Sequence, residues 1–243
     1  NLNLTFLFVM PVEATTLNQR TFSLLTQDCF IRDNIQKDDV LIVSIGGNDI
    51  ALAPAPCTIA AMAGLICCTP SVAIERGVSC CSLPVTDCCC GCGASLLSCA
   101  GSCPPCLGYF RHLFGTRVQH YIERLVSKTK PKKVLVCMIY YLDETPTPSW
   151  AGPALSAMGY DVNPGKLQLL IRKTFMEATS RIQIVGTEIV PVPLFNVLNG
   201  KSSEDYVARV EPSAVGGRKL AEFLFDIVNK SHDAGYGGLL STD

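Results

Sequence analysis

One stretch, Val40 to Asp49, constrains the fold of this chain more than any other. It reads VLIVSIGGND and places five aliphatic residues among six before a pair of glycines. Such a nearly unbroken apolar run is typical of a strand buried on both faces in a parallel sheet. Gly46 and Gly47 let the backbone turn sharply where the strand ends. Ligands of open α/β sheets bind outside the carboxyl ends of the strands, so Asn48 and Asp49 are predicted at a functional edge.

The rest of the chain alternates between strand and helix patterns. Short apolar runs predict strands, and apolar residues at helical spacing predict helices. The expected strands cover 4–10, 40–45, 134–139 and 188–192, and the expected helices cover about 15–34, 109–128, 167–178 and 213–229. Residues 140–160, rich in Pro, Thr and Ser, predict a long loop at the ligand-facing edge, and Pro191 marks its strand as an edge strand. This alternation predicts an α/β fold, a three-layer α/β/α sandwich with a parallel doubly wound sheet.

The turn after the 40–45 strand resembles a motif of a known family. Gly46, Gly47, Asn48 and Asp49 are similar to the Gly-x-Asn-Asp block of the SGNH (GDSL-like) hydrolases, which have a flavodoxin-like fold. In that family the asparagine donates a hydrogen bond to the oxyanion formed when a serine attacks an ester, so the resemblance implies this role for Asn48. It also implies that Gly46, Gly47 and Asp49 line the site. The alternative is an Asn-Asp turn whose side chains bond to the amides of their own loop.

A second block lies at the start of the last expected helix. Glu211-Pro212-Ser213, followed by Gly216, resembles the family's closing block, in which Asp-x-x-His-Pro precedes a helix. Here Ala208 replaces the aspartate and Glu211 replaces the histidine. A solvated glutamate is about two pH units too acidic to shuttle a serine proton well. Glu211 is therefore either an altered catalytic base, which would require burial, or a helix-start residue favoured by the helix dipole.

The sequence offers no clear catalytic nucleophile. The family's Gly-Asp-Ser block does not occur, and none of the histidines, His112, His120 and His232, ends an expected strand. Serines such as Ser44 and Ser213 lack the context of a nucleophile elbow. Two function classes remain open. One is a non-catalytic SGNH-like binding or accessory subunit. The other is a serine ester hydrolase whose nucleophile strand lies upstream of residue 1.

The strand order of flavodoxin-like folds makes a further prediction. In that order the first strand lies between the second and the third. If residues 4–10 form the second strand and 40–45 the third, a slot between them is expected to be filled by an upstream segment or a partner chain. Direct pairing of the 4–10 and 40–45 strands is the alternative.

An insertion from Ile50 to about Leu107 interrupts the alternation. Twelve of the 14 cysteines fall between Cys57 and Cys106. The favoured interpretation is a separate knob held by disulfides in an oxidising compartment, with metal ligation and acylation at a membrane surface as alternatives. The uncharged runs 50–74 and 88–110 have the length of membrane spans, but their proline, glycine and cysteine content argues against spanning.

Composition excludes other classes of function. Of 243 residues, 48% are hydrophobic and 17% charged, so the chain can bury one large core as a single domain. The 20 basic and 21 acidic residues nearly balance, which leaves no electrostatic footprint for nucleic acid. The sequence predicts no cofactor. The Cys-rich insertion is the expected contact surface for a protein partner, with association at a membrane surface as the alternative.

Overall fold

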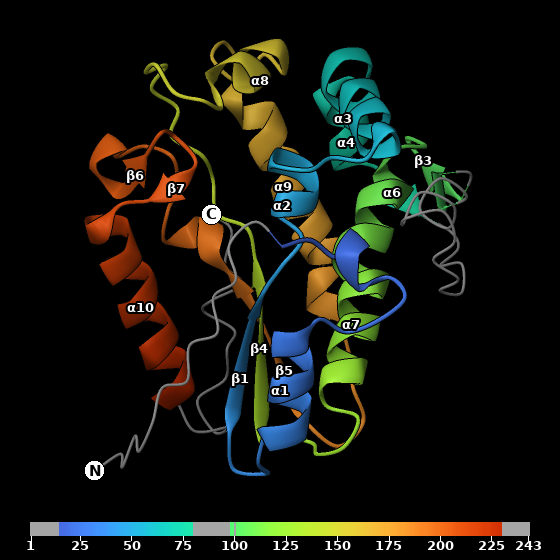
Figure 1. Cartoon of the computed structure of the whole chain (residues 1–243). Helices are drawn as coiled ribbons and strands as arrows, with labels where there is room; N and C mark the ends of the chain where they lie inside the picture. Colours follow the sequence, from blue (N-terminus) through green and yellow to red (C-terminus); the bar gives the residue numbers. More distant parts are fainter. Residues whose placement is uncertain (1–14, 80–97, 100, 230–243) are drawn as a thin grey trace.

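The structure, a computed structural model, describes residues 15–79, 98–99 and 101–229. It is a mixed α/β fold around a three-stranded parallel sheet in the order β1-β4-β5 (Figure 1). The strands are β1 Val40–Ser44, β4 Lys133–Met138 and β5 Glu188–Pro193. The predicted α/β class and the parallel pairing of the strand at 40–45 are confirmed. The strand expected at 4–10 lies outside the described residues.

The central strand of this sheet is β4. It pairs with β1 on one side and with β5 on the other, so that Lys133 lies opposite both Val40 and Glu188. All six of its residues are buried. The prediction that Pro191 lies in an edge strand is confirmed for the described sheet, since β5 ends it.

The strand β1 differs from its prediction. Only Val43 is fully buried, and Ile42 is 38% exposed. The expectations of a central strand buried on both faces were therefore wrong for the described sheet. The reason is that β1 ends this sheet, and no other described strand covers its outer edge.

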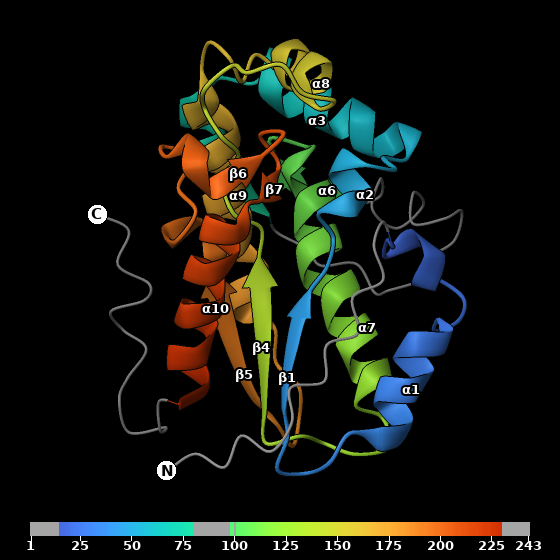
Figure 2. The ribbon, with the colours of Figure 1, turned by 60° about the vertical axis from the view of Figure 1, so that its left-hand side comes forward.

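Helices cover both faces of the sheet (Figures 1 and 2). The helix α10 packs on one face, where the alternate β4 residues Leu135 and Cys137 join Ile227 in one apolar cluster. Val134, Val136 and Met138 point to the opposite face and join the larger core. The main helical elements are η1 Asn18–Arg20, α1 Thr26–Asn34, α6 Leu107–Arg111, the π-helical segment η2 His112–Arg117, α7 Val118–Leu125, α8 Gly152–Ala157, α9 Pro164–Glu177, η3 Thr179–Arg181 and α10 Ala214–Asn229.

Most predicted helices are present, with three differences. The helix expected from about residue 15 begins at Thr26, because the Asp28 side chain accepts the amide hydrogen of Leu25 and caps that end. The helix expected at 109–128 is continuous, but its middle turns are a π-helix. The predicted loop at 140–160 contains the short helix α8.

The described part of the insertion belongs to the main core. Its elements are α2 Asn48–Ala51, α3 Pro56–Cys68, α4 Ser71–Glu75 and an antiparallel pair of β2 Val78–Ser79 with β3 Ser102–Cys103. Met62 and Leu65 of α3 and Ile74 of α4 join the same apolar cluster as the sheet. This part is therefore not the separate knob that was expected, because α3 and α4 bury their apolar residues against α6 and α9.

The cysteine chemistry stays a prediction. Within the described residues of the insertion, Cys67, Cys68, Cys103 and Cys106 are not in disulfides. The cysteines between residues 80 and 92 lie outside the described part. Where the structure describes the chain, no group of three or more His, Cys, Asp or Glu side chains is placed to hold a metal ion. No helix in this part is both long enough and apolar enough to cross a membrane.

A small hairpin lies between β5 and α10. After β5 come η4 Leu194–Asn196, η5 Ser203–Asp205 and the antiparallel pair β6 Tyr206–Val207 and β7 Glu211–Pro212. The start of α10 lies close against η5, which leads into this hairpin. A Cβ atom on Gly216 would lie 2.2 Å from the carbonyl oxygen of Asp205, whereas a Cβ atom on Gly217 would meet nothing within 4 Å.

These neighbouring glycines provide a matched test. We expect Gly216→Ala to lower the free energy of unfolding by about 1–3 kcal/mol, because the new methyl group overlaps the Asp205 carbonyl. Gly217→Ala should raise it by about 0.5–1 kcal/mol, because alanine costs less backbone entropy in a helix. Urea unfolding of both variants measures the difference. Equal stability of the two variants would contradict the close approach of α10 to Asp205 of η5.

Candidate functional site

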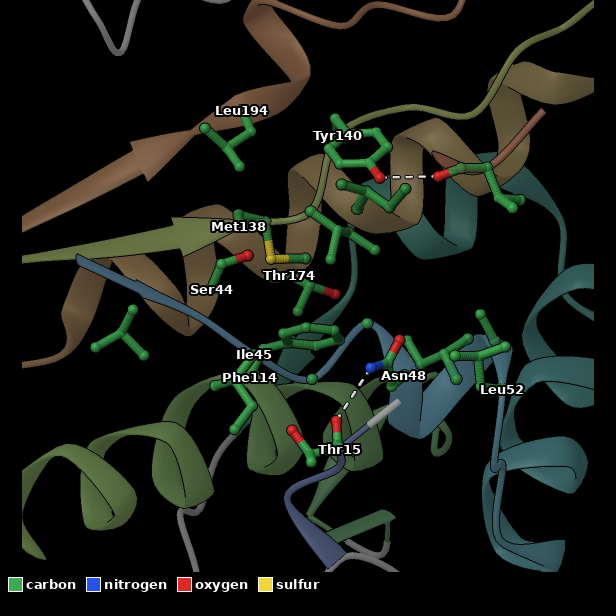
Figure 3. Close-up of a pocket in the computed structure, with 18 of the residues that line it drawn as sticks. Thr15, Ser44, Ile45, Asn48, Leu52, Phe114, Met138, Tyr140, Thr174 and Leu194 are labelled. Atoms are coloured by element: carbon green, nitrogen blue, oxygen red, sulfur yellow. Dashed lines mark hydrogen bonds between the residues drawn. The ribbon is translucent and has the colours of Figure 1, made fainter. Parts of the chain in front are cut away.

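A large cavity opens at the carboxyl end of the sheet (Figure 3). Its volume is about 990 Å³. It extends along β1, and most of its lining side chains are aliphatic or aromatic, among them Ile45, Phe114, Met138 and Leu194. The predicted site residues Gly46, Gly47, Asn48 and Glu211 all line it.

The turn after β1 needs a glycine at its first position. Gly46 has a φ of +99°, which L side chains rarely adopt. A Cβ atom there would also lie 2.8 Å from the ring of Phe114. The helix α2 starts two residues later at Asn48. The glycine thus lets the chain leave β1 over the Phe114 ring and turn Asn48 toward the cavity.

The side-chain amide of Asn48 is held in place. Its Nδ2 donates a hydrogen bond to the carbonyl oxygen of Thr15 at 3.1 Å (Figure 3). An amide nitrogen carries two hydrogens, and within the described residues Thr15 is its one acceptor. The second hydrogen is therefore available to an acceptor in the cavity, which is the chemistry that the resemblance implies for Asn48.

Asp49 has a different place from the one expected. Its side chain is 1% exposed and does not line the cavity. Its carboxylate accepts the amide hydrogens of Leu17 at 2.8 Å and Asn18 at 3.0 Å. Burial raises the pKa of Asp49, while these two hydrogen bonds and the charge of Arg117 oppose the rise. Asp49 thus anchors the segment whose Thr15 carbonyl orients Asn48.

Glu211 reaches the cavity from the hairpin before α10. It lies in β7, and its side chain is exposed, so the burial that a catalytic glutamate would require is not found. Nearby, the hydroxyl of Tyr140 donates a hydrogen bond to the carbonyl oxygen of Val210 at 2.8 Å. Burial raises the pKa of Tyr140 to about 12, and the negative charge of Glu211 adds to this rise. Tyr140 therefore stays neutral at physiological pH.

The hairpin that carries Glu211 is fixed by a buried arginine. Ala208 and Arg209 both have positive φ values, +49° and +72°. Arg209 is 2% exposed, and its Nη1 donates to the Oδ1 atom of Asp161 at 2.8 Å. Its Nε and Nη2 donate to the carbonyl oxygen of Asp143. These bonds compensate the local strain and hold β7 beside the cavity.

The two histidines that the structure describes, His112 and His120, do not line this cavity. His112 is buried in the π-helical segment, and His120 is exposed on α7, 4.0 Å from Glu123. His232 lies outside the described residues. Among the described residues that line the cavity, the aliphatic hydroxyls are those of Thr15, Ser44 and Thr174, and no histidine is present.

Several lining residues were not predicted from the sequence. Phe114 and Thr174 come from helices, Met138 ends β4, and Tyr140 and Trp150 come from the segment interpreted as a loop. The segment 140–160 was expected at this edge, where ligands of parallel sheets bind, but Tyr140 and Trp150 were not named as site residues. Comparisons with protein-family models, with curated proteins and with solved structures find no match for this chain.

Proposed function

We propose that this protein is an SGNH-like α/β protein, built as a three-layer sandwich, that binds a neutral apolar ligand without hydrolysing it. The observation that carries this proposal is an apolar cavity that brings together Asn48 and Glu211 but, among its described lining residues, no histidine. A serine needs a base near neutral pKa to become a nucleophile. Glu211 is exposed and is not buried as a catalytic base at this position would have to be.

The lining residues indicate the kind of ligand. A cavity of about 990 Å³ is large enough for a long apolar chain, and its walls are mainly aliphatic and aromatic. Asn48 supplies a hydrogen-bond donor, which suits a carbonyl or hydroxyl oxygen. The carboxylate of Glu211 disfavours an anionic ligand. We therefore propose a fatty ester or a long-chain alcohol rather than a free fatty acid.

Binding of a pyrene-labelled fatty ester tests this proposal. We expect saturable binding in a fluorescence titration, and we expect Asn48→Ala to weaken it by about 0.5–1.5 kcal/mol, or roughly two- to tenfold, through the lost hydrogen bond. Ala154→Trp should also weaken binding, because Ala154 lines the cavity and the larger side chain takes up its space.

The control for this titration is Asn163→Ala. Asn163 is an exposed asparagine that does not line the cavity, so its replacement should leave the affinity unchanged. The corresponding labelled fatty acid should bind less tightly than the ester at neutral pH. Absence of saturable binding, or equal affinities for Asn48→Ala and the parent protein, would overturn the proposal.

A serine ester hydrolase is the second candidate. The observation that favours it is the outer edge of β1, which no described strand covers and along which the cavity runs toward Asn48. A strand placed there would carry a nucleophile to the amide of Asn48. Labelling with a fluorophosphonate separates the two candidates, and we expect no adduct. A stoichiometric adduct on a serine would replace the binding proposal by the hydrolase.

A further inference from the structure

Two segments at one end of the molecule carry no charged side chains. Residues 50–74 and 145–160 contain no Asp, Glu, Lys, Arg or His, although 17% of the whole chain is charged. They form the last two residues of α2, the whole of α3, most of α4 and the segment that contains α8. Figures 1 and 2 show α3 and α8 together beyond the carboxyl ends of the strands. We call the surface formed by these two segments the uncharged end.

Large apolar side chains of the uncharged end are exposed. Their exposed fractions are 48% for Leu52, 57% for Ile59, 55% for Val72 and 51% for Trp150. They come from separate elements, so the exposed apolar surface does not belong to one helix alone. Such surfaces mark sites that contact a partner or a membrane.

The uncharged end is also a wall of the cavity. Leu52 and Trp150 are half-exposed and at the same time line the cavity, together with Met62, Ala154 and Met158. The exposed apolar surface is therefore continuous with the apolar interior of the proposed ligand site.

Two lysines of α9 hold this end to the body of the protein. Lys166 donates a hydrogen bond to the carbonyl oxygen of Ile66 near the end of α3. Lys173 donates to the carbonyl oxygen of Glu75 at the end of α4 at 2.9 Å. The Lys166 ammonium is thus directed at a backbone oxygen, and the Lys173 ammonium also pairs with the Glu177 carboxylate at 3.1 Å, so neither lies on the exposed face of α3.

We infer that the uncharged end docks on the surface of a neutral lipid layer. Burial of apolar side chains drives such interfacial binding, and tryptophan prefers the membrane–water interface. Anionic lipids would require a basic patch, which neither segment contains. Docking in this way would open the cavity toward the lipid, so that a ligand could pass between the two. The passage of a ligand rests on the proposed function, whereas the docking does not.

Trp150 is the only tryptophan of the chain and reports docking directly. With vesicles of phosphatidylcholine, we expect its fluorescence to shift to shorter wavelength and to be quenched by brominated acyl chains. Ile59→Glu places a charge on the exposed face of α3 and retains this reporter. We expect it to lower the vesicle-bound fraction by about tenfold or more.

The matched control is Val185→Glu. Val185 is 93% exposed and precedes β5, so it lies at the opposite end of the sheet, and its replacement should leave vesicle binding unchanged. Equal losses in the two variants, or no spectral response of Trp150 to vesicles, would overturn the inference. A concentration-dependent spectral shift without vesicles would assign the uncharged end to contact between two copies of this chain, and would overturn it as well.

Failure of the docking and failure of the proposed function are distinguishable. Ile59 does not line the cavity, so Ile59→Glu should still bind the pyrene-labelled ester in solution. If the parent protein binds the ester but does not dock on vesicles, this inference alone is overturned. Vesicle docking without saturable ester binding would overturn the proposed function alone.

Discussion

Asp28→Ala is expected to lower the free energy of unfolding by about 3–5 kcal/mol, since it removes one partner of a buried ion pair. Asp28 is 1% exposed, and its oxygens accept hydrogen bonds from Arg20 Nε at 2.8 Å and from the Tyr121 hydroxyl at 2.9 Å. The side chain of Arg20 is only 6% exposed. The substitution would leave the guanidinium of Arg20 buried without the carboxylate that it pairs with. Urea unfolding followed by circular dichroism measures the loss.

Two further variants make this prediction specific. Arg32 and Asp33 form an exposed pair at 2.7 Å, so Asp33→Ala should leave the stability almost unchanged. The double variant Arg20→Met with Asp28→Ala should recover part of the loss, because it leaves no buried charge without a partner. A loss for Asp28→Ala as small as that for Asp33→Ala would contradict the burial of this pair.

Gly46→Ala is the second substitution expected to have a large effect. The positive φ of +99° should cost about 1–3 kcal/mol in an alanine, and the overlap of its methyl group with the Phe114 ring should cost about 1–3 kcal/mol more. Because the turn would shift, the Asn48 side chain would no longer point into the cavity in the same way. Binding of the labelled ester should therefore weaken. Urea unfolding and the ester titration check the two effects.

A second glycine, Gly159, separates the cost of the positive φ from the cost of the side-chain overlap. Gly159 also has a positive φ, +68°, but a Cβ atom there meets nothing within 4 Å. Gly159→Ala should therefore show the backbone cost without the overlap and should leave ester binding intact. If Gly46→Ala were no more destabilising than Gly159→Ala, the contact between the turn and Phe114 would be refuted.

The local elements of the fold were largely predictable. The strand β4, the helix α9 and the helix α10 have clear apolar periodicity, and the structure confirms them. Periodicity succeeds here because each element buries a defined face. It failed for the start of α1, where one hydrogen bond from the Leu25 amide to Asp28 decides the boundary. Such a side-chain contact leaves little trace in the hydrophobic pattern.

The candidate site was predictable only in part. Gly46, Gly47 and Asn48 end a strand, and local rules place such residues at the ligand-facing edge. Asp49 follows them in sequence, yet its side chain turns inward to the amides of Leu17 and Asn18. This difference depends on a segment about 30 residues away in the chain. A motif therefore locates a turn better than it assigns the role of each side chain.

The sequence by itself determined the α/β class, the parallel pairing of β1 with its neighbour and the turn that carries Asn48, because periodicity and glycine conformation act within a few residues. Only the tertiary structure decided that Glu211 shares a cavity with Asn48, that Arg20 is buried against Asp28, and that α3 and α8 form one uncharged end. These features join segments far apart in the chain. They depend on how helices pack on the sheet, and that packing is set by contacts over the whole core.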